Sequence, residues 1–363
     1  MKLLYFASDF KIGLSVLLVD ELTAFAKSNI PLIAVSSDKQ QEEGLIDKVL
    51  EKNIDIRQYE NLDEHKDFKY KAKWLAKIIK DENITVVHVQ NNWQLVLLAY
   101  CKYVLRCKVK VIYTLHGFRH NSLVKSRLAQ FIIGLMLMLC TDRVRCMCSY
   151  LKSKFSLLSY KIFVLPLGIS DNFYEERKNE MPVGGIKAVF PAQFREGKNQ
   201  AMIIRAFSRY IDKNKDKHSV LVLPGSGPNW DKMKSLIAEL GCESQVILPG
   251  QCSKAEVLNW YLKSNVAVVA SNSETFGQSI VEPFILGRCV LTRKVGVATD
   301  IIENGITGYL FENEDDLFVL FEKIGNAPSL IYQCRENGSK IIDKFRWDII
   351  ALQYKSILNF LEE

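Results

Sequence analysis

The sequence predicts an α/β protein made of two doubly wound domains, each built on a parallel sheet. The chain has 363 residues, which is more than a single hydrophobic core usually supports. Short apolar runs typical of buried strands alternate with longer segments whose apolar residues recur at helical spacing. With 48% hydrophobic and 25% charged residues, the composition is that expected of a soluble globular protein.

The first half of the chain shows this alternation from its beginning. Strands are predicted at Lys2–Ala7, Pro31–Ser36, Ile84–Val89 and Val109–Leu115. Helices are predicted at Leu14–Lys27, Glu42–Lys52, Tyr70–Asp81 and Trp93–Arg106. No secretory signal is expected, because the first apolar run is short and already has the pattern of a buried strand. The nine cysteines are scattered along the chain, which favours a reduced, cytoplasmic setting.

Changes in composition predict the domain boundaries. We expect the first domain to cover residues 1–166, and a linker to cover 167–185, because residues 171–184 are charged and lack periodicity. The second domain then covers 186–345, and residues 346–363 hold a last helix near Trp347–Leu361. Around the linker and in the second domain, strands are predicted at Lys161–Leu165, Ile186–Phe190, Ser219–Leu223, Val246–Leu248, Val266–Ala270 and Cys289–Thr292, with a helix at Gln200–Ile211.

The stretch from Ser273 to Pro283 is the strongest candidate for a ligand site. It follows a predicted buried strand, and we expect a helix to open near Phe276 or Gly277. Ligands of open α/β sheets bind outside the carboxyl ends of the strands, where a helix N-terminus offers N–H groups to an anion. Glu274 and Glu282 flank these groups, which suits a ligand with phosphates between two hydroxyl-bearing ends, such as a nucleotide sugar. The alternative is a capping box at Ser279-x-x-Glu282 and a chance pair of glutamates.

Two further turns of the second domain carry residue types that bind phosphate or approach a ligand closely. Arg195 and Lys198 lie in a strand-to-helix turn, where cationic side chains can meet phosphate, although a solvated turn would have the same composition. Gly225 lies in the glycine-rich turn Pro224–Pro228, where backbone can approach a ligand. No Gly-Lys-Ser/Thr follows it, so a Walker P-loop is excluded.

The first domain offers weaker signals. His88 and His116 fall at the ends of predicted strands, which is the functional edge of such a sheet, although a lone histidine there is more often a hydrogen-bonded core residue. The first loop, residues 8–13, contains only Gly13, whereas the dinucleotide fingerprint needs three glycines, so a nicotinamide or flavin dehydrogenase is disfavoured. Gly13 could equally serve as a simple turn before the helix.

Positive charge is concentrated between Lys102 and Lys161. This stretch has 12 basic residues and a single acidic one, Asp142. It contains the ten-residue apolar run Phe131–Cys140, which is too short to span a bilayer and for which a buried helix is the favoured interpretation. A second interpretation is contact with anionic lipid or a lipid-linked phosphate acceptor, supported by the flanking residues Arg119, His120, Lys125 and Arg127. Nucleic acid is disfavoured as a partner, because no recognition motif accompanies the charge.

Several ordered motifs resemble those of a known family. Glu274 and Glu282 have seven residues between them, including Phe276-Gly277, the segment from Gly296 to Leu310 follows, and His116-Gly117 lies in the first domain. In these features the chain resembles the retaining glycosyltransferases of GT-B fold, glycosyltransferase family 4 or glycosyl transferases group 1. The resemblance implies two Rossmann-like domains facing a central cleft, with the last helix packing back on the first domain.

The resemblance also implies roles for individual residues. Glu274 would face the donor hexose, and the Phe276 and Gly277 amides, followed by Gln278, would face the diphosphate. Glu282 would bind the ribose hydroxyls, and His116 would face the donor sugar and acceptor. Lys198 matches a family lysine, whereas Gln193 stands where the family has arginine, so either Arg195 supplies the second positive charge or Lys198 acts alone. The remaining carried-over positions are Gly13, against the diphosphate or the acceptor, and Gly225, beside the nucleotide.

These assignments predict a chemistry. No Asp-x-Asp occurs in the chain, so we expect no metal ion, and the charge on the leaving diphosphate would be met by Lys198, Arg195 and the helix N-terminus. Attack would occur on the same face of the sugar, with the leaving oxygen taking the acceptor proton. The predicted function is transfer of a hexose, from a UDP-sugar by preference, to a glycan or lipid-linked saccharide in surface polysaccharide or glycoconjugate synthesis. The alternatives are a nucleotide-sugar epimerase and a degenerate, non-catalytic binding protein of the same fold.

Overall fold

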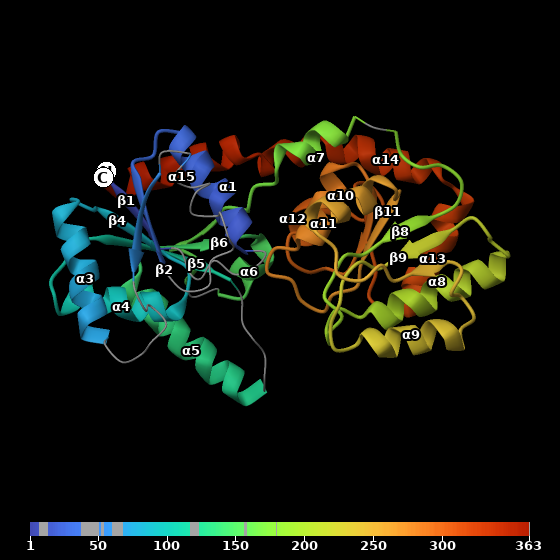
Figure 1. Cartoon of the computed structure of the whole chain (residues 1–363), viewed down its shortest axis with the longest axis horizontal. Helices are drawn as coiled ribbons and strands as arrows, with labels where there is room; N and C mark the ends of the chain where they lie inside the picture. The colour runs from blue at the N-terminus through green and yellow to red at the C-terminus, as the bar shows by residue number, and fades with distance from the viewer. Residues whose placement is uncertain are drawn as a thin grey trace. The chain divides into compact units, whose positions relative to one another are not determined.

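The chain forms two compact units. The structure, a computed structural model, describes residues 1–6, 14–37, 51, 54–59, 68–116, 123–155, 158–178 and 180–362 (Figure 1). The first unit comprises Met1–Gly168 together with Phe345–Glu363, and the second comprises Ile169–Lys344. Each unit is described by itself below.

A seven-stranded parallel sheet forms the centre of the first unit. Its strands are β1 (Leu3–Phe6), β2 (Leu32–Ser37), β3 (Asp55–Tyr59), β4 (Val86–Val89), β5 (Lys110–Leu115), β6 (Arg143–Cys146) and β7 (Ile162–Val164). They lie in the order β3-β2-β1-β4-β5-β6-β7, so the order of the strands reverses between β1 and β4. This reversal is the switch point at which doubly wound sheets bind ligands. The sequence analysis missed β3 and β6, because both are short and rich in charged or polar residues.

Six helices of the described residues belong to this unit. They are α1 (Leu14–Lys27), α3 (Phe68–Asp81), α4 (Asn92–Tyr103), α5 (Leu123–Cys140), α6 (Ser149–Ser153) and the C-terminal α15 (Trp347–Glu362). The rings of Phe25 on α1 and Tyr354 on α15 stack with centroids 4.5 Å apart, and both residues belong to the core formed with β1. The C-terminal helix is therefore part of the first unit's core. The helix predicted at Glu42–Lys52 lies outside the described residues, apart from the single residue Glu51.

The second unit contains a six-stranded parallel sheet. Its strands are β8 (Lys187–Val189), β9 (Val220–Val222), β10 (Val246–Ile247), β11 (Val266–Val269), β12 (Cys289–Thr292) and β13 (Tyr309–Leu310). The order is β10-β9-β8-β11-β12-β13, with a reversal between β8 and β11. Together the two parallel, doubly wound sheets confirm the predicted α/β class.

Helices cover the second sheet. They are α7 (Asp171–Glu176), α8 (Gln200–Asn214), α9 (Trp230–Glu239), α10 (Lys254–Leu262), α11 (Gln278–Ile285), α12 (Ala298–Ile301), α13 (Glu314–Asn326), α14 (Ser329–Gly338) and the 3₁₀ helix η3 (Ser339–Phe345). The stretch 171–184, which we expected to be an irregular linker, begins with α7 instead. Tyr174 of α7 is buried and donates to the Ile342 carbonyl at 3.2 Å. Arg177 follows α7 and donates to the Ile285 carbonyl at 2.7 Å, at the end of α11.

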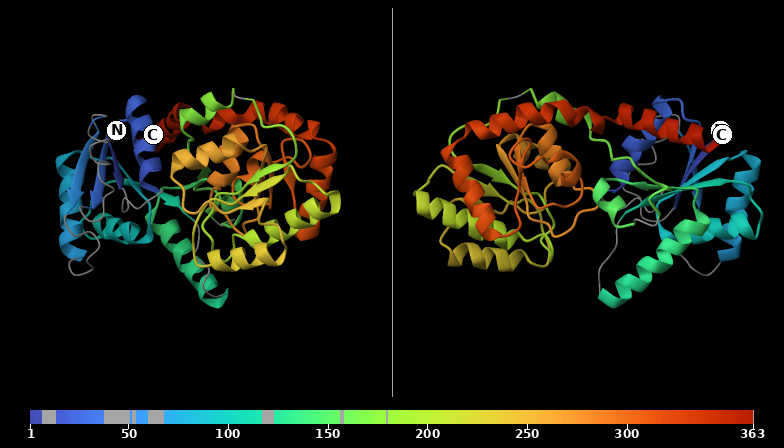
Figure 2. Two further views of the ribbon diagram at one scale, coloured as in Figure 1. Left: turned by 45° about the vertical axis from the view of Figure 1, so that its right-hand side comes forward. Right: turned by 180° about the vertical axis from the view of Figure 1, so that it is seen from behind.

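The apolar helix α5 is exposed, which corrects the expectation that residues 131–140 form a buried helix. Phe131 is 70% exposed and Leu139 58% exposed, whereas Leu137 is fully buried. A helix that is apolar on every side cannot bury all of its faces when it packs against its unit along one side only. Both views show α5 projecting from the sheet of its unit (Figure 2). In the part of the chain that the structure describes, no helix has the length and apolar character needed to cross a membrane.

Candidate functional site

Two predicted site residues meet at the switch point of the second sheet. Lys198 lies in the loop after β8 and Glu274 in the loop after β11, and these two strands are neighbours. The Lys198 Nζ atom donates a hydrogen bond to Glu274 Oε1 at 2.5 Å, and each side chain is 14% exposed. The pair therefore combines a cation and a carboxylate at the position where a doubly wound sheet binds its ligand.

Hydrogen bonds between the two loops hold this pair. The Asn272 amide donates to the Gly197 carbonyl at 2.8 Å, and Asn199 Nδ2 donates to the Ala270 carbonyl at 2.9 Å. Asn199 itself adopts a left-handed conformation, with φ 55°, which asparagine tolerates better than most residues. Sequence reasoning gave Asn199 no role. The only available signal was its place beside Lys198 in a turn.

The helix α11 begins at Gln278, one residue after the later of the two expected positions. Gly277 precedes it with φ 95°, a conformation that favours glycine. The first N–H groups of any helix lack partners within the helix, so those at Gly277 and Gln278 face out of its N-terminus. The Phe276 carbonyl accepts from Val297 N at 2.8 Å, and a Cβ on Gly296 would lie 2.5 Å from the same oxygen. The segment containing Gly296 therefore supports the loop that leads into α11.

Glu282 lies in the second turn of α11 and has an unusual acidity. Burial raises the pKa of its carboxyl from 4.5 to about 7, although the residue as a whole is only half-buried. The neighbouring Tyr261, on α10, has its pKa raised by burial and by the charge of Glu282. Near neutral pH the Glu282 carboxyl is therefore divided between its protonated and ionised forms, and both forms can bind hydroxyl groups.

A pocket of about 330 Å³ lies at the carboxyl ends of β8, β9 and β10. Predicted residues Gln193 and Gly225 line it, together with Ser226, Gln251 and Val257. The Gly225 amide donates to the Gly250 carbonyl at 2.7 Å, and a Cβ at Gly225 would lie 2.1 Å from the Ala192 carbonyl oxygen. Glycine is needed there because two chain segments pass within contact distance. The pocket and the Lys198–Glu274 pair lie at the same edge of the sheet.

Arg195 is exposed, and its backbone amide donates to the Gln193 carbonyl at 3.0 Å. The same carbonyl accepts from Gln200 Nε2 at 3.1 Å, so the turn is well ordered by its own bonds. Lys198 rather than Arg195 forms the ion pair with Glu274. A direct role for Arg195 stays a prediction.

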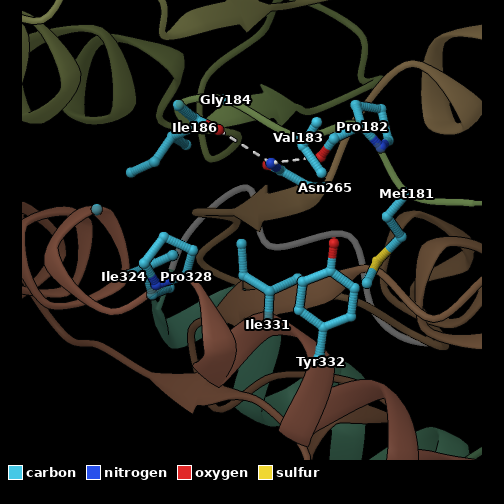
Figure 3. Close-up of a pocket in the computed structure, with 12 residues that line it drawn as sticks. Met181, Pro182, Val183, Gly184, Ile186, Asn265, Ile324, Pro328, Ile331 and Tyr332 are labelled. Carbon is cyan, nitrogen blue, oxygen red and sulfur yellow. Dashed lines mark hydrogen bonds between the residues drawn. The ribbon is translucent and has the colours of Figure 1, made fainter.

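A second hollow of about 150 Å³ lies at the opposite edge of this sheet (Figure 3). Ile186 and Asn265 line it, and they directly precede β8 and β11. Its walls are mostly apolar, and the Asn265 amide nitrogen donates to the Pro182 and Gly185 carbonyls at 3.2 and 3.0 Å. Because Asn265 Oδ1 also accepts from Lys187 N at 2.8 Å, its polar atoms serve the protein. This hollow does not have the charges that a diphosphate needs.

In the first unit the two histidines differ. His88 is fully buried and forms hydrogen bonds with Thr114 Oγ1 at 2.6 Å and with the Tyr354 hydroxyl at 2.7 Å, so it is a core residue. His116 is half-buried at the end of β5, and its Nε2 lies 2.7 Å from Gln90 Oε1. Burial, and secondarily the charge of Arg145, lowers the pKa of His116 from 6.5 to about 4, so the ring is neutral at pH 7.

Some predicted positions fall outside this description. Gly13, Gly117, Arg119 and His120 lie outside the described residues, as do the side chains of Lys125 and Arg127. Among the residues that are described, no group of three or more His, Cys, Asp or Glu side chains is placed to hold a metal ion.

The architecture defines the class of protein. Two parallel, doubly wound units form the GT-B fold, and the chain superposes on solved structures of that kind. It matches Anabaena Alr3699/HepE in complex with UDP with a TM-score of 0.79 at 16% identity, covering 99% of this chain and 100% of that one. It matches the apo form of the lipopolysaccharide outer core galactosyltransferase WaaB with a TM-score of 0.75 at 15% identity, covering 99% of each chain. The predicted GT-B fold is thereby confirmed.

The family follows from sequence comparison. Residues 172–340 match the family of glycosyl transferases group 1. The chain is 29% identical over 146 residues to a D-inositol 3-phosphate glycosyltransferase of Thermobifida fusca (strain YX), covering 38% of this chain and 34% of that protein. It is 24% identical over 310 residues to an N-acetyl-alpha-D-glucosaminyl L-malate synthase of Bacillus anthracis, covering 79% and 77%. The first match thus spans about a third of that relative's length. Residues 172–340 belong to the group 1 glycosyl transferases, and the resemblance is confirmed.

Proposed function

We propose that this protein is a retaining glycosyltransferase that moves a hexose from a nucleoside diphosphate sugar to a glycan or lipid-linked saccharide. The observation that carries the proposal is the Lys198–Glu274 pair at the switch point of the second sheet, next to the N-terminus of α11. Cations and helix amides bind phosphate, whereas carboxylates accept hydrogen bonds from sugar hydroxyls. The family of residues 172–340 supports the same reaction.

In this mechanism different residues bind the diphosphate, the hexose and the ribose of the donor. Lys198 and the first amides of α11 bind the diphosphate, Glu274 accepts from hydroxyls of the hexose, and Glu282 accepts from the ribose. Lys198 already forms an ion pair with Glu274, so the oxygens of an incoming diphosphate would compete with the Glu274 carboxylate for the Lys198 ammonium group. Donor binding would therefore weaken or break the bond between Lys198 and Glu274. The cation and the amides stabilise the charge that develops on the leaving phosphate, so we propose that no metal ion is required.

A UDP-sugar is the proposed donor, and surface polysaccharide or glycoconjugate synthesis is the proposed setting. The structural neighbour Alr3699/HepE was crystallised with UDP, and a second neighbour is a lipopolysaccharide galactosyltransferase. The retaining course is proposed from the resemblance to retaining glycosyltransferases; in such a course the diphosphate oxygen that leaves would take the proton of the attacking acceptor hydroxyl on the same face of the sugar.

Thermal unfolding with a panel of nucleoside diphosphates tests the donor site. A ligand that binds the folded state raises the melting temperature, so UDP is expected to raise it more than GDP or ADP. Absence of a shift with every nucleotide, in wild-type protein, would contradict the nucleotide-sugar proposal. Release of UDP from UDP-sugars, measured with and without saccharide acceptors, then separates the alternatives. Acceptor-independent isomerisation of the sugar indicates an epimerase, and binding without turnover indicates a non-catalytic protein.

We propose further that the first unit rests on an anionic membrane, so that the protein is cytoplasmic and peripheral on the inner face of the cell membrane. The contact would be the α5 surface, defined here as the exposed side chains Tyr103, Phe131, Ile132, Leu135, Met138, Leu139 and Tyr160. The Tyr103 hydroxyl donates to the Leu139 carbonyl at 2.5 Å, and Lys161 Nζ donates to the Met138 carbonyl at 2.5 Å. These bonds link the end of α4 and the turn before β7 to α5.

The charge around the α5 surface supports an anionic lipid as its partner. Residues 102–161 contain 12 basic residues and one acidic residue, and of the basic ones Arg145 is buried against Glu21. Apolar and tyrosine side chains beside lysine and arginine are typical of proteins at the membrane interface.

Flotation with lipid vesicles tests this contact. Wild-type protein is expected to float with vesicles containing phosphatidylglycerol and not with pure phosphatidylcholine. Replacing Phe131 and Leu139 together by serine should release it, whereas Leu352→Ser, at a comparably exposed position on α15, should not. Equal flotation of both variants would contradict the assignment of the surface, and self-association in place of vesicle binding would indicate a protein partner.

A further inference from the structure

A second cation is bonded to the loops that hold the Lys198–Glu274 pair. Arg293 follows β12, the strand next to β11, so it lies at the same carboxyl edge of the second sheet. Its Nη1 atom donates to Asn272 Oδ1, which also accepts from Asn199 Nδ2 at 2.6 Å. The Asn272 amide donates to the carbonyl of the residue before Lys198. Through Asn272, Arg293 is therefore connected to the chain on both sides of Lys198.

The loop that carries Arg293 also packs against Glu274. A Cβ on Gly296 would lie 2.9 Å from Glu274 Cβ and 2.5 Å from the Phe276 carbonyl oxygen, so the backbone of this loop touches both residues. The Arg293 amide donates to the Val269 carbonyl at 3.2 Å, which continues the pairing of β11 with β12 past the end of β12. These contacts fix the backbone of Arg293 near Glu274 and near the loop that leads into α11.

Arg293 keeps its positive charge uncompensated. Among the residues that the structure describes, no carboxylate pairs with it, and its partly exposed guanidinium bonds only to the neutral Asn272. Further N–H donors of this group therefore remain for a ligand. Lys198, by contrast, is paired with Glu274, and the two together carry no net charge. The side chain of Arg195 makes no hydrogen bond within the described part of the chain, so nothing there orients it.

A bound diphosphate needs more positive charge than the other groups of the site provide. Both of its phosphates are ionised near neutral pH, whereas the N-terminus of a helix contributes roughly half a unit of positive charge. A guanidinium presents a planar fork of N–H donors that can bind two phosphate oxygens at once. Arg293 can bind phosphate in this way without giving up an ion pair, while its bond to Asn272 holds the side chain in place.

We propose that Arg293 binds the diphosphate of the sugar donor and supplies the positive charge that Lys198, paired with Glu274, does not. This inference rests on the proposed glycosyltransferase function and adds to it a binding residue from the loop after β12. Gln193, which lines the pocket at the same edge of the sheet, is neutral and cannot provide this charge.

Calorimetric binding of UDP, UMP and uridine to the full-length protein tests this assignment. Arg293→Met should weaken UDP binding about tenfold, because charge-assisted hydrogen bonds to phosphate are lost. Binding of UMP should weaken less, since UMP lacks the second phosphate, and binding of uridine should stay unchanged. Arg209→Met removes the same charge from an exposed position on α8 and should bind all three ligands as the wild-type protein does. Equal weakening of UDP and uridine in Arg293→Met would contradict a contact with phosphate.

A second variant separates the charge of Arg293 from its role in folding. Arg293→Gln keeps an NH₂ group that can donate to Asn272 and removes the charge. It should bind UDP as weakly as Arg293→Met, while its melting temperature without ligand stays at the wild-type value. The affinity of the wild-type protein for UDP should fall more steeply with rising NaCl concentration than that of either variant, because salt screens the charge that the variants lack. A merely structural role of Arg293 would leave this salt dependence unchanged.

The outcomes distinguish this inference from the proposed function. If the wild-type protein binds UDP and Arg293→Gln binds it equally well, the donor site stands and Arg293 is not part of it. Loss of UDP affinity in Arg195→Met, with none in Arg293→Gln, would assign the charge to Arg195 instead. A change confined to the KM of a phosphate-bearing acceptor would place Arg293 against the acceptor and overturn the inference. Absence of UDP binding in the wild-type protein would overturn both proposals.

Discussion

Each of the two sheets has an ion pair beside it, and the two pairs differ in how far they are buried. In the second unit, Lys198 and Glu274 come from loops after neighbouring strands, and each side chain is 14% exposed. In the first unit, Arg145 and Glu21 come from β6 and α1, and their side chains are only 1% and 4% exposed. The Lys198–Glu274 pair is partly exposed and can be reached by a ligand, whereas the buried Arg145 also donates to backbone carbonyls of the protein. In the proposed function, the Lys198–Glu274 pair contacts the substrate, whereas the Arg145–Glu21 pair stabilises the first unit.

The largest expected effect is on the stability of the buried pair. Arg145 also donates to the Leu165 carbonyl at 3.0 Å and to the Pro166 carbonyl at 2.8 Å. Arg145→Met removes these bonds and leaves Glu21 as an uncompensated buried charge, which should lower the free energy of unfolding by about 3–5 kcal/mol. Denaturant unfolding measures this loss. Combining Arg145→Met with Glu21→Leu should recover part of it, because no charge then remains buried.

Arg209→Met is the matched control, since Arg209 pairs with Asp315 at 2.7 Å on the surface. Little change is expected there, because exposed pairs are screened by solvent. A similar loss of stability in both variants would contradict the distinction between buried and exposed pairs.

For the Lys198–Glu274 pair of the second unit, we expect a large loss of activity and only a small change in the free energy of unfolding. Glu274→Ala should reduce sugar transfer by about 10²–10³-fold, the range seen when a group that contacts the reacting centre is removed. The free energy of unfolding should change by no more than about 1 kcal/mol, because the pair is partly solvated. Transfer kinetics and denaturant unfolding measure the two effects. Unchanged activity in Glu274→Ala would remove this residue from the proposed site, and Glu303→Ala, an exposed position after α12, serves as the control.

The carboxyl group of Glu282 should lower the stability of the folded protein at high pH while it strengthens donor binding. Its pKa is about 7 in the folded protein, against an ordinary value of 4.5, so the folded state holds the proton more tightly than the unfolded state. The contribution of Glu282 to the free energy of unfolding is therefore most favourable below pH 4.5 and falls as the pH rises through 7, by an amount on the order of 3 kcal/mol. Glu282→Gln removes this cost, so the variant should be more stable than the wild-type protein at pH 8 and equal to it near pH 4.

The same substitution should weaken donor binding, because an amide offers a single acceptor atom where a carboxylate offers two. Unfolding curves at pH 4, 6 and 8, with the donor KM at pH 8, give both quantities. A wild-type stability that rises between pH 5 and 7 relative to Glu282→Gln would contradict the raised pKa.

Local sequence patterns predicted most of the regular elements. The bounds of α1 and β12 agree residue for residue with Leu14–Lys27 and Cys289–Thr292, because apolar periodicity and a bounded apolar run report burial directly. β3 and β6 were missed, since Asp55–Tyr59 and Arg143–Cys146 carry charges that propensity assigns to loops. Arg145 is the instructive case. The charge of Arg145 can be buried in β6 because Glu21 on α1 forms an ion pair with it. Glu21 lies far from β6 in the chain, so no local pattern reveals this pairing.

For the candidate site, too, the sequence pointed to some residues and not to others. The paired glutamates, Lys198 and the glycines of the second unit stand in short motifs, so the sequence could name them as candidates for a ligand site. Gln90 has no such pattern around it, and no spacing in the sequence connects it to His116. The burial of the run Phe131–Cys140 was predicted wrongly for a related reason. Apolar composition shows that a helix prefers apolar contacts, but it does not show whether the rest of the fold covers that helix.

The sequence by itself determined the two parallel sheets, the family of residues 172–340 and the residue types at the end of β11, because each depends on neighbours within a few positions along the chain. Only the tertiary structure decided that Lys198 meets Glu274, that α5 remains exposed, and that Gln90 presents its carbonyl oxygen to His116. These outcomes depend on which distant segments share one sheet edge. Hydrogen-bond direction and burial belong to that assembled environment, so no local pattern encodes them.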